Sequence, residues 1–239
     1  MAGGLAQVRS RARSRLGDVR GSSTARRVRR RRLTYLTAEK LAGIEACLRR
    51  IRRSGVAGDF VEAGVALGGS AVVIARHLDA GRAFHGYDVF GMIPPPGEED
   101  PREVHERYAT IRSGGSAGIG GDRYYGYRED LLGEVQATLA RFGVPVDGRR
   151  VQLHPGLFAD TLRPEGPLAF AHLDCDWYDP VKLCLTRLYP RLSPGGCIVV
   201  DDYYDYGGAR RATHEFLAGA ADVEVDPISA GRHLVLRRL

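Results

Sequence analysis

The sequence has few cysteines and no long apolar run, and each of these two features counts against particular classes of protein. Its 239 residues contain four cysteines, Cys47, Cys175, Cys184 and Cys197, without Cys-x-x-Cys pairing or metal-ligand spacing. We expect buried, reduced thiols rather than disulfides or a zinc site. No stretch approaches the ~18 to 20 apolar residues of a membrane span, and the start lacks the apolar core of a secretory signal. A cytoplasmic protein with no membrane partner is the expectation.

Two catalytic loops are also missing. The sequence has no Gly-x-x-x-x-Gly-Lys-[Ser/Thr] phosphate-binding loop and no Gly-x-Ser-x-Gly nucleophile elbow. These absences count against a metal-dependent hydrolase or phosphotransferase. That class stays open as an alternative because the sequence carries a group of aspartates suited to a metal ion.

Positive charge is concentrated at the start of the chain. The formal net charge is +6, but residues 1–32 contain eleven Arg and a single acid, Asp18, so they carry +10 and residues 33–239 carry −4. A block of like charge between Ser, Gly and Ala is typical of a disordered arm. We predict a disordered tail over 1–32 and one globular domain over 33–239. An RNA-binding protein led by the tail is a disfavoured alternative, since the body is acidic.

Strand and helix patterns alternate along residues 33–239, which indicates a parallel sheet. A helix is expected at about 37–54. A β-rich run at 59–64, a glycine turn, a helix at 71–78 and a strand at 83–87 form a βαβ unit. The remaining expected elements are helices at 131–142, 181–192 and 210–218, strands at 150–153, 168–173 and 197–200, and a terminal strand pair at 223–225 and 233–236.

Residues 89–127 interrupt this alternation with clusters of proline, glycine and tyrosine around one helical candidate at 101–112. Long insertions in compact domains are either lids or disordered segments. Three tyrosines within 124–127 favour a lid, because a solvated linker seldom carries so many aromatic residues. We expect the lid to close over a bound substrate.

Acidic residues directly follow the predicted strands, at Glu62, Asp88, Asp174, Asp201 and Asp202. In open α/β sheets the ligand lies beyond the carboxyl ends of the strands. Carboxylates gathered there repel one another unless a cation compensates them. Asp174, Asp201 and Asp202 follow strands that can be neighbours, and their oxygens suit Mg²⁺, with Ca²⁺ or Mn²⁺ as substitutes. Helix capping by Asp201 and Asp202 is the alternative.

The first strand-to-helix turn, Glu62 to Gly69, is not the Gly-x-Gly-x-x-Gly of dinucleotide sites. A carboxylate in a glycine turn suits a cofactor with an amino or sulfonium group better than one with phosphates. Asp88 is placed to accept hydrogen bonds from ribose hydroxyls. S-adenosylmethionine (SAM) fits both features, and a tight turn without a ligand is the alternative.

With these motifs in this order, the chain resembles the macrocin O-methyltransferase (TylF-like) family over roughly 33–239. The segments that carry the resemblance are 58–65 with 68–70, 86–90, 172–178 and 188–203. The resemblance implies a Rossmann-like class I methyltransferase fold: a doubly wound, mostly parallel seven-stranded α/β sheet with helices on both faces. It also implies SAM and Mg²⁺ as cofactors, a sugar-containing acceptor and a homo-oligomer.

The resemblance implies site residues as well. The expected SAM-site residues are Glu62, Ala63, Gly64, Gly69, Ser70, Asp88, Asp160 and Asp174, and the expected Mg²⁺ ligands are Asp174, Asp201 and Asp202. A turn or capping role for Asp160 is equally open.

The general base is open, because relatives can carry a basic residue three positions after the first metal aspartate and this chain has Trp177 there. Asp174 is the first candidate, followed by His105, Tyr203 and Tyr204. The other histidines, His172 among them, are expected to be structural. The expected reaction is in-line methyl transfer to one hydroxyl of a vicinal diol on a glycosylated natural product. A nucleotide-linked sugar, a glycan or a nitrogen acceptor stays an alternative.

Overall fold

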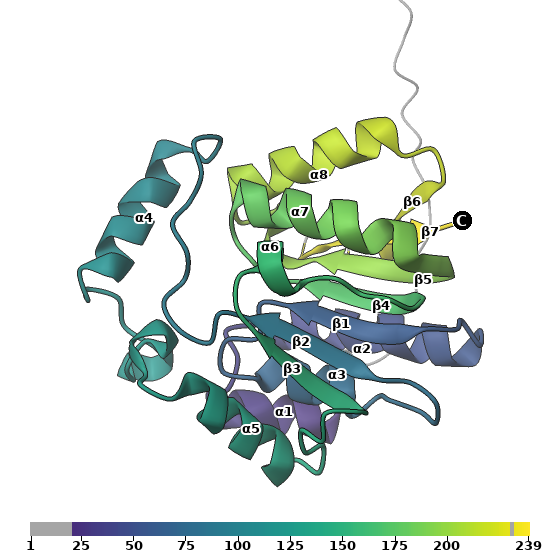
Figure 1. Cartoon of the computed structure of the whole chain (residues 1–239), viewed down its shortest axis with the longest axis horizontal. Helices are drawn as coiled ribbons and strands as arrows, with labels where there is room; N and C mark the ends of the chain where they lie inside the picture. The colour runs from purple at the N-terminus through teal and green to yellow at the C-terminus, as the bar shows by residue number, and fades with distance from the viewer. Residues whose placement is uncertain (1–20, 230–231) are drawn as a thin grey trace, which may run out of the picture.

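A seven-stranded sheet lies between two layers of helices (Figure 1). The computed structural model describes residues 21–229 and 232–239. The strands are β1 Asp59–Ala63, β2 Phe84–Asp88, β3 Val151–Pro155, β4 Leu168–Leu173, β5 Leu192–Val200, β6 Val223–Asp226 and β7 Leu234–Arg238. Their order is β3-β2-β1-β4-β5-β7-β6, in which β7 alone runs opposite to the other six strands. The predicted doubly wound, mostly parallel α/β sheet is confirmed.

The helices are α1 Ser23–Arg30, α2 Ala38–Arg53, α3 Gly69–Ala75, α4 Arg102–Arg112, α5 Leu131–Arg141, α6 Phe158–Thr161, α7 Tyr178–Leu188 and α8 Gly207–Gly219. Alternate residues of the central strands face two separate cores. Phe60 and Phe170 pack with α2 and α3, whereas Val61 and Ala171 pack with α7 and α8. Strands buried on both faces explain the nearly continuous apolar runs in the sequence.

The predicted helix at 181–192 differs from the structure at both ends. Helix α7 starts at Tyr178 and ends at Leu188, and Tyr189–Arg191 form a 3-10 turn. Pro190 accounts for the earlier end, because proline has no backbone N–H and its ring clashes with the preceding helical turn. Strand β5 then begins at Leu192 rather than at 197, with Leu192 paired to Leu168 of β4.

The predicted disordered tail is wrong for residues 23–30, which form α1. The Ser22 hydroxyl caps the helix by accepting a hydrogen bond from the Ala25 N–H at 3.1 Å. Ala25 and Val28 are buried in the core that α3 and α5 share, while Arg27 lies over the Phe142 ring. One apolar pair at i, i+3 is therefore enough to dock a helix whose other residues are mostly arginines. Residues 1–20 lie outside the described part of the chain.

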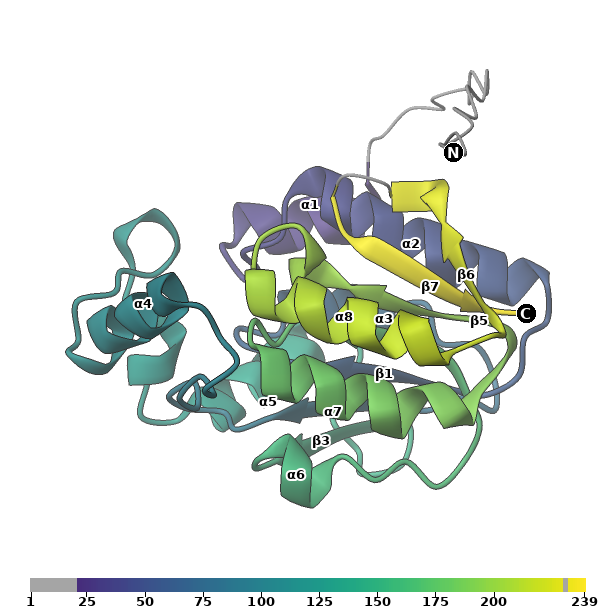
Figure 2. The same ribbon diagram turned by 90° about the horizontal axis from the view of Figure 1, so that it is seen from above.

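The insertion at 89–127, which we call the lid after its predicted role, is ordered. It contains α4 and two 3-10 turns, Ile119–Gly121 and Tyr125–Tyr127. Helix α4 stands apart from the sheet, at the left of both overall views (Figure 2). Its inner side packs into a small core with Trp177, formed by Ile93, Val104, Ile111 and Tyr124. Among the described helices, none combines the length and apolar character needed to cross a membrane.

Substitution of Val28 tests whether α1 belongs to the domain. Val28→Ala removes two fully buried methyl groups, so we expect the free energy of unfolding to fall by about 2 kcal/mol in urea. Arg29→Ala, at an exposed position of the same helix, is the control and should change it by less than ~0.5 kcal/mol. Equal effects of the two substitutions would contradict the docking of α1.

Candidate functional site

Two cavities meet at the carboxyl ends of the central strands. The first, which we call the α7 cavity, has a volume of about 570 Å³. The second, which we call the acidic cavity, has a volume of about 410 Å³. The residues that line both are Gly64, Asp88, Tyr125, Asp174, Asp176 and Trp177. A ligand that passes this junction would touch both cavities.

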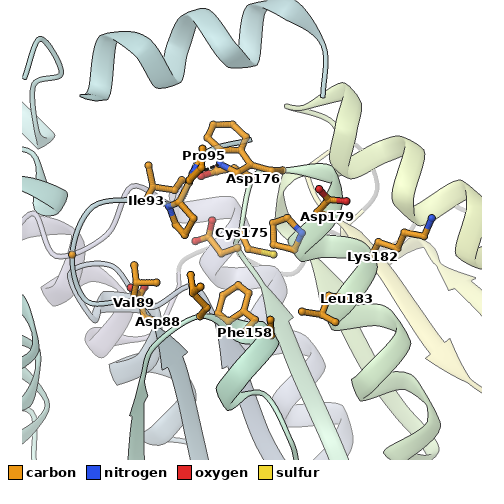
Figure 3. A pocket seen from close by; sticks show the side chains of 18 of the residues that line it. Asp88, Val89, Ile93, Pro95, Phe158, Cys175, Asp176, Asp179, Lys182 and Leu183 are labelled. Atoms are coloured by element: carbon orange, nitrogen blue, oxygen red, sulfur yellow. Dashed lines mark hydrogen bonds between the residues drawn. The ribbon is translucent and has the colours of Figure 1, made fainter. Parts of the chain in front are cut away.

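The α7 cavity is mainly apolar. Val89, Phe158 and Leu183 surround it, with Asp88 at one end and Lys182 of α7 at the other (Figure 3). The acidic cavity differs in character, because the segment 33–37, the turn after β1, the lid and the aspartates after β4 and β5 line it. The two cavities therefore suit a flat apolar group in the α7 cavity and, beside it, a polar, cation-binding group in the acidic cavity.

The junction depends on the close approach of Gly64 to Asp174. The Asp174 N–H donates a hydrogen bond to the Ala63 carbonyl at 2.9 Å. Gly64 has a φ of +93°, and a Cβ there would lie 1.7 Å from the Asp174 carbonyl oxygen. Only glycine fits this position, both for its backbone conformation and for its space. The absence of a side chain thus lets the ends of β1 and β4 meet.

Asp88 fixes the shape of the turn after β1. Its Oδ2 accepts hydrogen bonds from the N–H groups of Val65 at 2.7 Å and Ala66 at 2.9 Å, and its Oδ1 accepts one from Phe90 at 2.7 Å. The carboxylate is buried but still lines both cavities. Because each carboxylate oxygen can accept more than one hydrogen bond, Asp88 can hold the turn and also bind a ligand hydroxyl.

Three predicted SAM-site residues lie behind the turn and line neither cavity: Glu62, Ala63 and Gly69. Glu62 is fully buried, and its Oε1 lies 2.9 Å from Nδ1 of His172. Burial opposes the charge of His172, but the carboxylates of Asp201 and Glu62 outweigh it and raise the pKa of His172 to about 10. His172 is thus the partner of buried carboxylates. The Gly69 N–H donates to the Leu33 carbonyl at 2.8 Å.

Ser70 and Asp160, the other predicted SAM-site residues outside the junction, lie in different places. Ser70 is buried in the first turn of α3 and lines the acidic cavity. Asp160 is exposed on α6 and lines neither cavity, although its neighbour Ala159 lines the α7 cavity. The structure therefore brings Gly64, Ser70, Asp88 and Asp174 to the two cavities.

The aspartates form two overlapping groups that share Asp202. Ligand oxygens of Asp174, Asp176 and Asp202 lie within 4.8 Å of one another, and so do those of Asp201, Asp202 and Asp205. The predicted trio is thus divided: Asp201 and Asp202, which open a 3-10 turn, belong to one group, and Asp174 shares only Asp202 with it. Asp176 belongs to the same group as Asp174. Its backbone has a φ of +57°, and its N–H donates a hydrogen bond to Asp202 Oδ2 at 3.0 Å.

The two groups differ in their electrostatics. Burial and mutual repulsion raise the pKa values of Asp174 and Asp202 well above the ordinary value, and that of Asp176 to about 7. For Asp201 burial works in the same direction, but His172, His233 and Lys40 outweigh it and lower the pKa. The first group thus needs a cation to be fully ionised. Three close carboxylate oxygens are a donor set that suits a small divalent ion.

The candidate bases other than Asp174 line neither cavity. His105 and Tyr204 are exposed, and the Tyr203 hydroxyl lies 2.8 Å from His214 Nε2. Trp177, at the position where relatives can carry a base, is buried, and its Nε1–H donates to the Pro94 carbonyl at 3.1 Å. Trp177 therefore anchors the start of the lid. The sequence prediction missed four charged residues of the acidic cavity: Lys40, Arg107, Asp176 and Asp205.

The strand order, the glycine turn after β1, the carboxylate after β2 and the aspartates after β4 and β5 together define a Rossmann-like class I methyltransferase. Solved structures agree with this class. The O-methyltransferase NovP is 29% identical with a TM-score of 0.70, covering 86% of this chain and 81% of its own. The methyltransferase TomG from Streptomyces achromogenes, in complex with SAM, shares the fold at 19% identity with a TM-score of 0.54, covering 92% and 91%.

The chain belongs to the macrocin O-methyltransferase (TylF) family, whose profile matches residues 8–228. The match includes most of the arginine-rich segment that the predicted resemblance left out. A 4'-O-methyltransferase of a rhamnosyl-tetracenomycin from Streptomyces olivaceus is 33% identical over 82% of this chain and 71% of its own length. Mycinamicin III 3''-O-methyltransferase from Micromonospora griseorubida is 32% identical over 77% and 69%. The protein is an O-methyltransferase, which decides against the hydrolase alternative.

Substitution of Gly64 tests the junction against a matched glycine. Gly55 also has a positive φ, of +63°, but a Cβ there meets nothing within 4 Å. Gly55→Ala should therefore cost only the backbone strain of about 1 to 2 kcal/mol. Gly64→Ala adds a clash with the main chain, so we expect a clearly larger loss in urea unfolding or no folded protein. Equal losses would contradict the close approach of β1 and β4.

Proposed function

We propose that the protein transfers a methyl group from SAM to a sugar hydroxyl of a glycosylated natural product, with Mg²⁺ at the aspartates. The observation that carries the proposal is the junction where Asp88 and Asp174 face both cavities. Further support comes from the relatives, which are named for O-methylation of a rhamnosyl-tetracenomycin and of mycinamicin III. The homo-oligomer implied by the family resemblance stays a prediction.

The two cavities suit the two ends of SAM. The α7 cavity offers Val89 and Phe158 to the apolar faces of adenine, and Asp88 offers acceptors to the ribose hydroxyls. The turn after β1 and Ser70 in the acidic cavity suit the amino-acid end. When bound, SAM supplies an electrophilic methyl group on a sulfonium. The junction at Asp174 then lies between the adenosine and amino-acid ends, which is where that group belongs.

The acidic cavity suits a metal-bound sugar diol. Asp174, Asp176 and Asp202 would hold the ion, since their ligand oxygens lie together. Asp201 stays a predicted ligand: Lys40 contacts its Oδ2, whereas its buried Oδ1 has no hydrogen-bond partner among the described residues. When bound, Mg²⁺ supplies the charge that orients two adjacent hydroxyls and makes one of them more acidic. Asp174 is the proposed acceptor of the hydroxyl proton, since it alone of the candidate bases lines the cavities.

The lid completes the acceptor site. Tyr124 and Tyr125 line the acidic cavity and offer aromatic faces to the apolar side of a sugar ring. Arg107 of α4 lines it as well and brings positive charge toward the aspartates. Closure of this lid would exclude water and align the hydroxyl with the methyl group, and alignment alone can lower the barrier by ~7 to 11 kcal/mol.

Calorimetric titration with S-adenosylhomocysteine tests the cofactor site. Asp88→Ala removes charge-assisted acceptors for the ribose hydroxyls, so we expect the affinity to fall by ~100-fold or more. Asp147→Ala is the matched control, because Asp147 also accepts hydrogen bonds from backbone N–H groups, those of Arg149, Arg150 and Val151, but lines neither cavity. No binding by the folded wild-type chain, or equal loss in both variants, would refute this site.

Chelation tests the metal requirement. With rhamnosylated polyketides and macrolide glycosides as trial acceptors, EDTA should reduce methyl transfer at least ~100-fold, because Mg²⁺ orients and acidifies the diol. Added Mg²⁺ should restore the activity, and EDTA already saturated with Mg²⁺ should have no effect. Binding of S-adenosylhomocysteine should survive chelation. Full activity in excess EDTA would contradict a metal-dependent reaction.

A further inference from the structure

Tyr35 is an aromatic residue of the acidic cavity that the proposed function leaves without a role. It lies in the segment 31–37, which joins α1 to α2, and it lines the cavity although it is 49% exposed. Its ring meets the ring of the lid residue Tyr125 edge to face, with the centroids 6.1 Å apart and the planes at 68°. Tyr35 therefore lies at the mouth of the cavity, and about half of its surface is open there.

The main chain is anchored on both sides of Tyr35. The Leu33 N–H donates a hydrogen bond to the Val28 carbonyl at 3.0 Å, and the Leu33 carbonyl accepts one from the Gly69 N–H at 2.8 Å. A Cβ at Gly69 would lie 2.3 Å from that carbonyl oxygen, so the missing side chain lets the segment dock on α3. On the other side, Leu36 is buried in the core with α2. Tyr35 is thus held in place before a ligand binds, which lowers the cost of binding.

The same segment contacts the lid at a second place. The Arg32 guanidinium lies against Gly120, where a Cβ would be 2.7 Å from its Cζ, and one of its nitrogens is 3.6 Å from an Asp122 carboxylate oxygen. The side chains of Arg32 and Asp122 are each 53% exposed, so this ion pair adds little stability. The segment and the lid therefore meet at Arg32 and again at Tyr35, which leaves Tyr35 between the cavity and the solvent.

Three tyrosines form a series from the inside of the cavity to its mouth. Tyr124 is buried, Tyr125 is half-buried and Tyr35 is exposed. The ring centroids of Tyr124 and Tyr125 are 4.4 Å apart, and those of Tyr125 and Tyr35 are 6.1 Å apart, so the rings adjoin in that order. The proposed function assigns the two inner rings to the sugar. A group attached to that sugar and directed toward the solvent would therefore meet Tyr35.

The size of the acidic cavity supports this division. Its volume of about 410 Å³ is near the lower end of the ~300 to 1,000 Å³ of sites that enclose a drug-sized ligand. Under the proposed function, the ion and the amino-acid end of SAM share this space with the sugar. The cavity then has no room for a polycyclic or macrocyclic aglycone, the group to which the sugar is attached, so the aglycone extends past the mouth.

We propose that Tyr35 is a specificity-determining residue that binds the aglycone of the acceptor. The inference rests on the proposed function and adds the subsite that distinguishes a glycoside with a large apolar aglycone from its sugar alone. A tyrosine ring suits this role, because it offers a large apolar face to a ring system and loses little conformational freedom on binding. The ring carries the contact, so phenylalanine should replace tyrosine at this position.

Methyl-transfer kinetics of the full-length chain with two acceptors of the same sugar test this inference. The first acceptor is the rhamnosylated polyketide or macrolide glycoside that the wild type methylates best, and the second is the methyl glycoside of its sugar. Tyr35→Ala should raise the KM for the first acceptor at least ~10-fold with little change in kcat, and leave kcat/KM for the second unchanged. Tyr35→Gln, a second variant with a larger side chain, should do the same, and Tyr35→Phe should behave as wild type.

The control is Val225→Ala, because Val225 of β6 is 48% exposed and lines neither cavity; it should change neither constant. The affinity for S-adenosylhomocysteine should be the same in all variants, as expected if each is folded. An unchanged KM for the first acceptor in Tyr35→Ala or Tyr35→Gln, or an equal rise for both acceptors, would overturn the role of Tyr35 and leave the proposed function intact. No methylation of any glycoside by the wild type would overturn the proposed function and this inference with it.

Discussion

The contact between Gly64 and the main chain of Asp174 is the constraint on which the site depends. It brings the turn after β1 against the end of β4, so the cavity that suits adenosine and the cavity that holds the aspartates open onto each other. A side chain at residue 64 would force the two strand ends apart. Asp88 and Asp174 lie close to each other because residue 64, between them, has no side chain.

Compensation of negative charge is the second constraint. Five carboxylates lie at the carboxyl ends of the strands and cannot all be ionised in a buried place without cations. They are those of Glu62, Asp174, Asp176, Asp201 and Asp202. The fold supplies His172 to Glu62 and Lys40 to Asp201. The remaining carboxylates have no such partner among the described residues. Under the proposed function, an ion at Asp174, Asp176 and Asp202 would supply the compensating charge there.

The sequence pattern predicted the sheet well because strands that are buried on both faces and glycine turns leave strong local signals. Helix α1 was missed because one apolar pair, Ala25 and Val28, lies within a run of arginines and the packing partner is distant in sequence. The end of α7 was misplaced because the helical apolar pattern continues past the point where Pro190 interrupts the helix.

Within the site, position after a strand predicted which carboxylates would gather but not where each would point. Asp176 was missed because it lies beyond the end of β4, in a segment with a positive φ whose course no periodic pattern predicts. The contact of Asp201 with Lys40 could not be predicted, because the two residues are 161 positions apart in the sequence. Lysine at the third position after Thr37, where a capping box has an acid, was the one local signal.

The most direct test of the shared junction is ¹³C nuclear magnetic resonance of SAM bound to the protein with Mn²⁺ in place of Mg²⁺, without an acceptor. The paramagnetic ion broadens nearby nuclei steeply with decreasing distance. We expect a ¹³C label in the SAM methyl group to be broadened far more by Mn²⁺ than a label at adenine C8, and both to be sharp with Mg²⁺. Equal broadening of the two labels, or a sharp methyl resonance with both Mn²⁺ and SAM bound, would contradict a metal site next to the methyl group.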